Sequence, residues 1–338
     1  MSFRFLMRFP WARCGSIGFI MGLLAIAPVV ADDEPAFSKA VYTYKTVEQL
    51  EIKADVYRLQ DAVARPVVVW LHGGALIMGD RGGVPRQLRD LARRHVFVLV
   101  SLGYRLAPQA KLQEIIDDLT DGLNWVRHEG PELFHGDPSR MVVTGASAGG
   151  YLALMSGIVI DPPPQAIVSY WGFGDVDGDW TTKPSEPYRK GKLIDEEDAW
   201  NGVGDAVVTG SNQANGLGRA AFFMYLKQTG RWINVVSGLD PETDRDKLTP
   251  LCPVRNVSSN YPPTLFLHGT ADVDVPVEQS IAMAKELERH GVDHELITIE
   301  GGGHSLWGGD PKLIDRAFRR SVEYIRQRLT DPSPDTPQ

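Results

Sequence analysis

The sequence predicts an α/β protein in which a mostly parallel, twisted sheet carries helices on both faces. Apolar runs rich in β-branched residues alternate along the chain with segments whose apolar residues recur at helical spacing. Repeats of this unit build parallel sheets, because each helix crosses one face to reach the next strand. The alternation lapses once, over residues 172–250, and then resumes. We therefore expect one domain over residues 32–330, with residues 172–250 as a cap-like insertion after the fourth recognisable strand.

The first half of this domain contains four expected strands and three expected helices. Each strand is a short apolar run, and each helix repeats apolar residues three and four positions apart. The strands are residues 67–71, 96–102, 141–144 and 166–171, and the helices are residues 84–95, 112–128 and 147–160.

The insertion is rich in glycine, aspartate and aromatic residues and shows no clean strand. Beyond it we expect strands at residues 264–268 and 295–299 and helices at residues 277–289 and 311–329. The aromatic residues of the insertion could cover a binding site, and the alternative is a packed excursion that never touches substrate. They are Phe173, Trp180, Tyr188, Trp200, Phe222, Phe223, Tyr225 and Trp232.

The two ends of the chain differ from the rest. Residues 1–31 place Arg4, Arg8 and Arg13 before an apolar run that ends in small residues, which predicts a cleaved signal peptide and a secreted or periplasmic protein. A retained N-terminal membrane anchor is the alternative. Residues 331–338 are polar and rich in proline, which predicts a disordered tail.

Charge and cysteine content narrow the possible partners. Loss of the three arginines of residues 1–31 would lower the formal net charge from −8 to −11, which disfavours nucleic acid and anionic membranes as partners. The cleaved chain would keep Cys252 as its single cysteine, so no internal disulfide is expected. We expect no stable membrane association after cleavage, and the sequence does not determine the oligomeric state.

A strand, a sharp turn and a helix surround Ser147. The segment Gly145-Ala146-Ser147-Ala148-Gly149 matches the GxSxG pattern and follows the strand expected at residues 141–144. The two glycines leave room for a tight turn that exposes the serine hydroxyl, and the helix N-terminus adds a positive partial charge. This placement favours Ser147 as a nucleophile over a simple glycine-rich turn.

A second glycine-rich turn follows the strand at residues 67–71. In His72-Gly73-Gly74-Ala75 the backbone can direct N–H groups at a substrate carbonyl. We expect an oxyanion hole built from the backbone N–H groups of Ala148, Gly74 and Ala75, with Gly73 as the alternative donor. His72 itself is expected to be structural.

A serine nucleophile needs a base and an orienting carboxylate, and both must lie later in the chain if the order is serine, acid, histidine. Asp272 follows the strand at residues 264–268, and His304 follows the strand at residues 295–299. Catalytic groups gather at the carboxyl ends of parallel strands. We expect Asp272 as the acid, with Asp274 as its rival or as a helix cap, and His304 as the base. His268 is expected to pack or hydrogen-bond on the strand of the acid.

Taken in order, these segments resemble the α/β-hydrolase esterases, in particular bacterial esterases and lipases similar to hormone-sensitive lipase and the dienelactone-hydrolase-like group. The resemblance covers residues 40–330 and includes Tyr104-Arg105-Leu106-Ala107-Pro108. It implies a carboxylesterase with a Ser-His-Asp triad, an acyl-enzyme, no metal or organic cofactor, and a small or medium ester as substrate. Acetylated and feruloylated saccharides are among the candidates. Ala75 departs from the family's third glycine and allows fewer backbone conformations than glycine does.

Three other interpretations remain at this point. One is a peptidase similar to the catalytic domain of prolyl oligopeptidases, and one is a catalytically silent binding protein on the same fold. The third is a calcium loop, because Asp175, Asp177, Asp179 and Glu186 match ligand positions of such loops. Trp180 stands where the loop needs glycine, so a solvated acidic turn is the expected state and no metal site is predicted.

Overall fold

The computed structural model describes residues 36–330 apart from 95–96 and 214. The expected signal peptide (1–31) and the expected tail (331–338) lie outside the described residues. Among the helices of the described residues, none combines the length and the apolar character that a membrane span needs.

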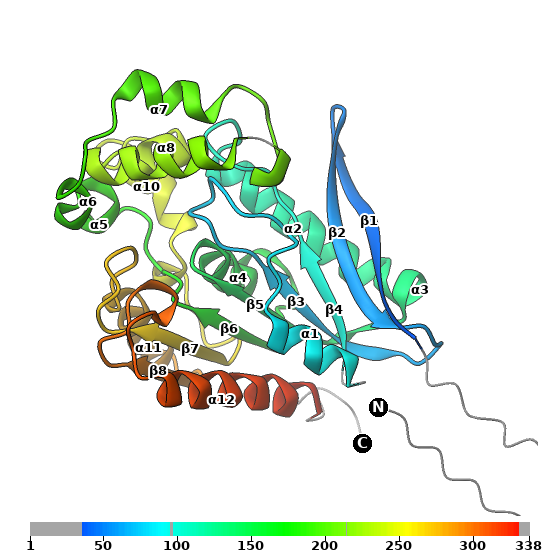
Figure 1. The fold of residues 1–338 in the computed structure, drawn as a ribbon. Coiled ribbons are helices and arrows are strands. Elements are labelled where there is room, and N and C mark those ends of the chain that lie inside the picture. The colour runs from blue at the N-terminus through cyan, green and yellow to red at the C-terminus, as the bar shows by residue number, and fades with distance from the viewer. Residues whose placement is uncertain (1–35, 95–96, 214, 331–338) are drawn as a thin grey trace, which may run out of the picture. The chain divides into compact units, whose positions relative to one another are not determined.

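In the part of the chain that the structure describes, eight strands form one mixed sheet in the order β1-β2-β4-β3-β5-β6-β7-β8 (Figure 1). The first two pairings in that order are antiparallel and all the others are parallel. The predicted α/β fold with a mostly parallel sheet is therefore confirmed. The strands are β1 (Phe37–Val47), β2 (Leu50–Leu59), β3 (Arg65–Leu71), β4 (Val98–Leu102), β5 (Gly136–Ala146), β6 (Ala166–Tyr170), β7 (Thr264–Gly269) and β8 (His294–Ile299).

Helices cover both faces of the sheet. Alternate residues of β3 point to opposite faces, so Val67 and Val69 join one apolar cluster and Val68 and Trp70 join another. The first cluster includes residues of α2, α4 and α11, and the second includes residues of α1 and α12. The bounds are α1 (Arg86–Arg93), α2 (Leu112–His128), α3 (Gly130–Phe134), α4 (Ala148–Val159), α11 (Glu278–Arg289) and α12 (Pro311–Thr330).

The β1–β2 hairpin was absent from the sequence interpretation, which assigned no element to residues 36–66. The side chains of β1 alternate between half-buried and exposed, with none fully buried. An edge strand of this kind gives a weak apolar signal, because it packs one side only. β5 begins at Gly136, five residues before the apolar run that predicted it, because most of these first residues are polar or only half-buried.

The insertion between β6 and β7 consists of short helices and of the 14-residue α8 (Gly216–Thr229), which lie together at the upper left of Figure 1. Several of its buried apolar residues, including Phe222 and Ile233, belong to the same cluster as α2 and α4. The insertion thus shares the core of the domain. Its elements are α5 (Asp179–Thr182), α6 (Glu186–Arg189), α7 (Glu196–Val203), η1 (Ser211–Gln213), α8 (Gly216–Thr229), α9 (Trp232–Ser237), α10 (Arg245–Leu248), η2 (Thr249–Leu251) and η3 (Pro253–Arg255).

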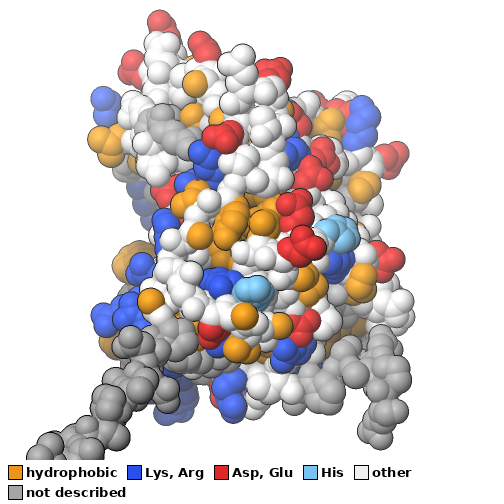
Figure 2. Space-filling model, turned by 90° about the vertical axis from the view of Figure 1, so that its right-hand side faces the viewer, with side chains coloured by type: hydrophobic (Ala, Val, Ile, Leu, Met, Phe, Trp, Pro, Cys, Tyr) orange, Lys and Arg blue, Asp and Glu red, His pale blue; other side chains and the backbone are white. Residues whose placement is uncertain are grey.

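Acidic and basic side chains are interspersed on the face shown in Figure 2, with hydrophobic side chains gathered near its middle. Some of the charges of the β1–β2 hairpin form ion pairs, such as Lys39 with Asp55. The expectation that nucleic acid is no partner stays a prediction.

A buried ion-pair network fixes α2 to the segment after β4. The carboxylate of Asp118, on α2, is fully buried and accepts hydrogen bonds from the backbone N–H, Nε and Nη2 of Arg105 at 2.8–3.0 Å. Lys45 of β1 adds an ion pair at 2.7 Å. Removing one partner of such a network leaves the others charged and buried.

We expect Asp118→Ala to lower the free energy of unfolding by about 3–5 kcal/mol, because Arg105 would lose its buried counter-charge. Asp121→Ala is the matched control, since the half-exposed Asp121 pairs with Lys45 only and should cost less than about 1 kcal/mol. Urea denaturation of both variants checks the difference, and equal losses would contradict the assigned role of Asp118.

Candidate active site

Ser147 lies on the turn that joins β5 to α4, with φ 56° and ψ −122°. The turn is crowded. A Cβ on Gly145 would lie 2.1 Å from the carbonyl oxygen of Gly149, and a Cβ on Gly149 would lie 2.1 Å from that of Leu71. The N–H of Ser147 donates to Tyr170 O at the end of β6. A serine with positive φ is thereby held at the N-terminus of a helix.

The structure brings Ser147, His304 and Asp272 into one hydrogen-bonded series. His304, in the short η4 (His304–Leu306) after β8, places Nε2 3.0 Å from Ser147 Oγ. Its Nδ1 lies 2.8 Å from Oδ2 of Asp272, in the loop after β7. The imidazole can take a proton from the hydroxyl while the carboxylate stabilises the resulting charge.

Asp272 and Asp274, the two candidates for the acid, have different hydrogen-bond partners. Burial alone would raise the pKa of the Asp272 carboxyl, but hydrogen bonds from His268 and His304 hold that pKa well below its usual range. Asp274 instead accepts a hydrogen bond from the hydroxyl of Tyr188. It caps no helix, because α11 begins after Val277 with no side-chain cap.

Two further histidines have structural environments, as expected. His268 is buried, with Nδ1 2.7 Å from Ser280 Oγ and Nε2 2.9 Å from Val275 O. His72 stacks on Tyr104 with ring centroids 4.2 Å apart, and burial lowers its pKa to about 4. His72 is therefore neutral near pH 7.

The segment after β3 forms a tight turn beside Ser147. The N–H groups of Ile77 and Met78 both donate to Gly74 O, which leaves Ala75 in the left-handed region with φ 56°. Gly73, Gly74 and Ala75 line the same cavity as Ser147. Ala148 is the first residue of α4, so no helical carbonyl accepts its N–H. The assignment of the oxyanion donors stays a prediction.

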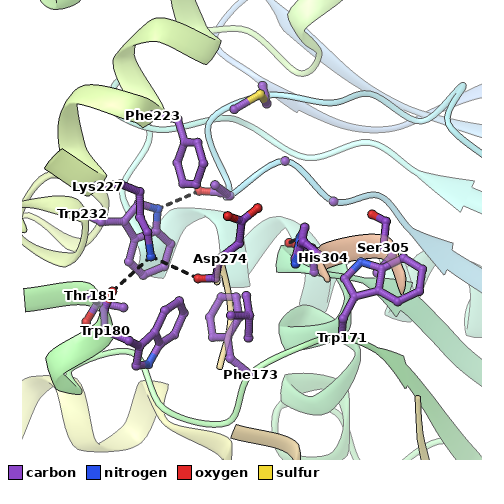
Figure 3. A pocket seen from close by; sticks show the side chains of 17 residues that line it. Trp171, Phe173, Trp180, Thr181, Phe223, Lys227, Trp232, Asp274, His304 and Ser305 are labelled. Carbon is purple, nitrogen blue, oxygen red and sulfur yellow. Dashed lines mark hydrogen bonds between the residues drawn. The ribbon is translucent and has the colours of Figure 1, made fainter. Parts of the chain in front are cut away.

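Insertion residues form much of the cavity beside Ser147, which has a volume of about 310 Å³ (Figure 3). The indole Nε1 of Trp232 donates to Ala75 O at 3.2 Å, which ties the insertion to the turn after β3. Two lining residues, Lys227 and Trp171, were missed by the sequence interpretation, because neither lies in a motif. The insertion contributes Phe173, Trp180, Thr181, Phe223, Lys227 and Trp232.

The acidic segment that resembles a calcium loop does not assemble as one. Among the described residues, the potential ligand atoms within 4.8 Å of one another belong to Asp175, Asp177 and Cys252, without Asp179 or Glu186. Arg255 forms two hydrogen bonds with the carboxylate of Asp177, and burial raises the pKa of the Cys252 thiol to about 12. These residues fit a metal poorly, since a thiol must deprotonate to bind one.

The expectation of a solvated acidic turn is also wrong for part of this segment. The Asp177 side chain is only 4% exposed and is paired with Arg255, whereas that of Asp179 is 79% exposed. Burial, with the neighbouring carboxylate of Asp177, raises the pKa of Asp175 from 3.8 to about 6.

A raised carboxyl pKa makes stability depend on pH. The stabilising contribution of protonated Asp175 is complete below pH 3.8 and is lost as the pH rises through about 6. We expect Asp175→Asn to have a higher free energy of unfolding than wild type at pH 8. This difference between variant and wild type should be roughly 1–2 kcal/mol larger at pH 8 than at pH 4. Urea denaturation at both pH values measures this. Asp179→Asn, at an exposed site, is the matched control, and an equal effect of both variants would contradict the argument.

Solved structures similar to this chain share its fold. A protein of unknown function from Staphylococcus aureus subsp. aureus Mu50 aligns with TM-score 0.68 and 20% identity, covering 86% of this chain and 100% of that one. Esterase 2 of Thermogutta terrifontis, solved phosphorylated by paraoxon, aligns with TM-score 0.61 and 20% identity over 87% of this chain and 96% of that one. These likenesses confirm the α/β-hydrolase fold.

Curated relatives match this chain over a small part of their own length. The non-reducing polyketide synthase adrD of Penicillium rubens is 27% identical over 330 residues, which is 83% of this chain and 13% of the synthase. The synthase trt4 of Aspergillus terreus is 28% identical over 329 residues, which is 82% of this chain and 14% of the synthase.

A family match covers more than half of the chain. The sequence model of the BD-FAE family matches residues 54–287, from within β2 to within α11. The matched segment contains the turn after β3, Ser147, the insertion and Asp272, while His304 lies beyond its end. The chain belongs to the BD-FAE family.

Proposed function

We propose that the chain is a serine carboxylic-ester hydrolase. The observation that carries this proposal is the hydrogen-bonded series of Asp272, His304 and Ser147 at the wall of a largely apolar cavity. In acylation, Ser147 Oγ bonds to the ester carbonyl carbon while His304 Nε2 takes the hydroxyl proton. The C–O bond to the alcohol then breaks, and the alcohol leaves with that proton.

Deacylation repeats these steps with water. His304 takes a proton from water, the hydroxide oxygen bonds to the acyl carbon, and Ser147 leaves with the returned proton as the acid is released. In both stages the negative oxygen of the tetrahedral intermediate is stabilised by N–H donors. We assign these to Ala148 with Gly74 and Ala75, and Gly73 is the alternative donor. Loss of one such donor typically costs about 3–4 kcal/mol of barrier.

The cavity favours a small or medium ester. Its volume of about 310 Å³ and its aromatic walls suit an acyl or alcohol group of limited size. Structures of the Thermogutta esterase with propionate and with butyrate bound are among the similar ones, which supports short acyl groups. A panel of 4-nitrophenyl esters and natural esters, including acetylated and feruloylated saccharides, would rank the accepted acyl groups by length and bulk.

Loss of the nucleophile should abolish both turnover and covalent labelling. We expect Ser147→Ala to lower kcat for 4-nitrophenyl butyrate by about 10⁶-fold. Paraoxon should phosphorylate the wild-type serine with release of 4-nitrophenolate, and mass spectrometry would locate the adduct. Ser305→Ala, which changes a second serine of the same cavity, should still be labelled. An unlabelled wild-type protein would favour a silent binding protein.

Substitution of Asp272 should lower kcat/KM far more than substitution of Asp274. Asp272→Asn should lower kcat/KM for the same ester by about 10⁴-fold, because the amide no longer holds the imidazole in its productive state. Asp274→Asn should lower it by less than about tenfold, since its carboxylate binds Tyr188 rather than His304. Steady-state kinetics of both purified variants would decide, and the reverse order would move the role of the acid to Asp274.

A further inference from the structure

Lys227 places a positive charge inside the cavity beside Ser147. Its side chain comes from α8 and reaches the cavity opposite His304, with Asp274 between them (Figure 3). The residue is only 4% exposed. Burial lowers the pKa of its ammonium group to about 8, although Asp274 and Asp272 act in the opposite direction. The side chain is therefore mostly charged near pH 7.

Among the residues that the structure describes, two backbone carbonyls accept hydrogen bonds from this ammonium group. Its Nζ donates to the backbone carbonyls of Trp180 at 3.2 Å and Asp274 at 3.1 Å. An ammonium group has three N–H donors, so one is left for another acceptor. The ion pairs found among residues 36–330, excluding the undescribed 95–96 and 214, do not include Lys227. A buried ammonium with no carboxylate partner is costly.

The surroundings of Lys227 favour a ligand with an apolar body and a charged end. The ammonium lies 5.2 Å from the ring centroid of Trp180 and 5.8 Å from that of Tyr188. Trp232, Phe173 and Phe223 line the same part of the cavity. An acyl or alcohol group running from Ser147 towards Lys227 would pass along aromatic walls before reaching the charge.

We infer that Lys227 forms a subsite for a carboxylate on the substrate, so that the enzyme prefers esters that carry a negative charge away from the scissile bond. The inference rests on the proposed ester hydrolysis and adds a substrate class to it. A carboxylate at Nζ would take the third N–H and form the direct ion pair that Lys227 lacks among the described residues. Asp274 opposes such an anion, and its hydrogen bond from Tyr188 offsets part of that repulsion.

Paired esters test this subsite directly. Mono(4-nitrophenyl) adipate carries a carboxylate at the end of its acyl chain, and 4-nitrophenyl 6-methylheptanoate has an isopropyl group in its place. A second pair, 4-carboxyphenyl butyrate and 4-isopropylphenyl butyrate, moves the charge to the alcohol. The measured quantity is the ratio of kcat/KM for the anionic ester to that for its neutral partner. Comparing each ratio between wild type and variant cancels the intrinsic reactivity of the esters.

Lys227→Met should lower this ratio about 10-fold to 100-fold for at least one pair, as expected for loss of a charge-assisted hydrogen bond. A purely structural role would lower both members of a pair equally and leave the ratio unchanged. Ratios that stay within about twofold of wild type for both pairs would overturn the inference and leave the proposed function standing.

Asp274→Asn gives the opposite test and decides the matter if Lys227→Met does not fold. Removing this negative charge from the same cavity should raise the ratio for the pair that reaches Lys227, and a ratio that falls or stays the same would overturn the inference. Two results together would overturn the proposed function and the subsite with it. The wild-type protein would hydrolyse neither member of either pair, and paraoxon would not label Ser147.

Discussion

The rest of the site depends on how closely β5, the start of α4 and the end of β3 pack. Gly145 and Gly149 allow backbone atoms of these elements to approach where any Cβ would collide. The chain can therefore reverse within one residue and hold Ser147 at positive φ. Because β3, β5, β6, β7 and β8 run parallel, their carboxyl ends lie on one edge of the sheet, where the loops after β7 and β8 bring Asp272 and His304 to the serine.

The insertion is joined to the turn after β3 by polar contacts as well as by packing. Trp232 donates to Ala75 O, and the fully buried guanidinium of Arg219 donates to Ile77 O and Ala107 O. Ser211 also exchanges hydrogen bonds with Gly79. The turn that we propose to present N–H donors is thus held by the same segment that lines the cavity. In the proposed reaction, a change in the insertion would therefore also affect the orientation of these donors.

Much of the fold could be predicted because it depends on local patterns. The buried parallel strands are continuous apolar runs, and the long helices show apolar spacing that matches their contacts with the sheet. The β1–β2 hairpin and the short insertion helices escaped prediction, since half-buried edges and four-residue helices leave little periodicity. Lys227 was not predicted as a site residue, because its proposed role depends on the residues that surround it in the folded protein. The pairing of Asp177 with Arg255 joins residues 78 positions apart and has no sequence signature.

The charged side chains around the cavity differ in their hydrogen-bond and ion-pair partners. This difference is the basis of the proposed carboxylate subsite. Asp272 has His304 and His268 as partners, and Asp274 has Tyr188. Lys227 has two backbone carbonyls and two aromatic faces, which stabilise a cation less than a carboxylate does. Its pKa is lowered as a result of burial. A carboxylate bound at Nζ would act against that change, so the free energy of binding would include the gain from a direct ion pair with this buried ammonium group.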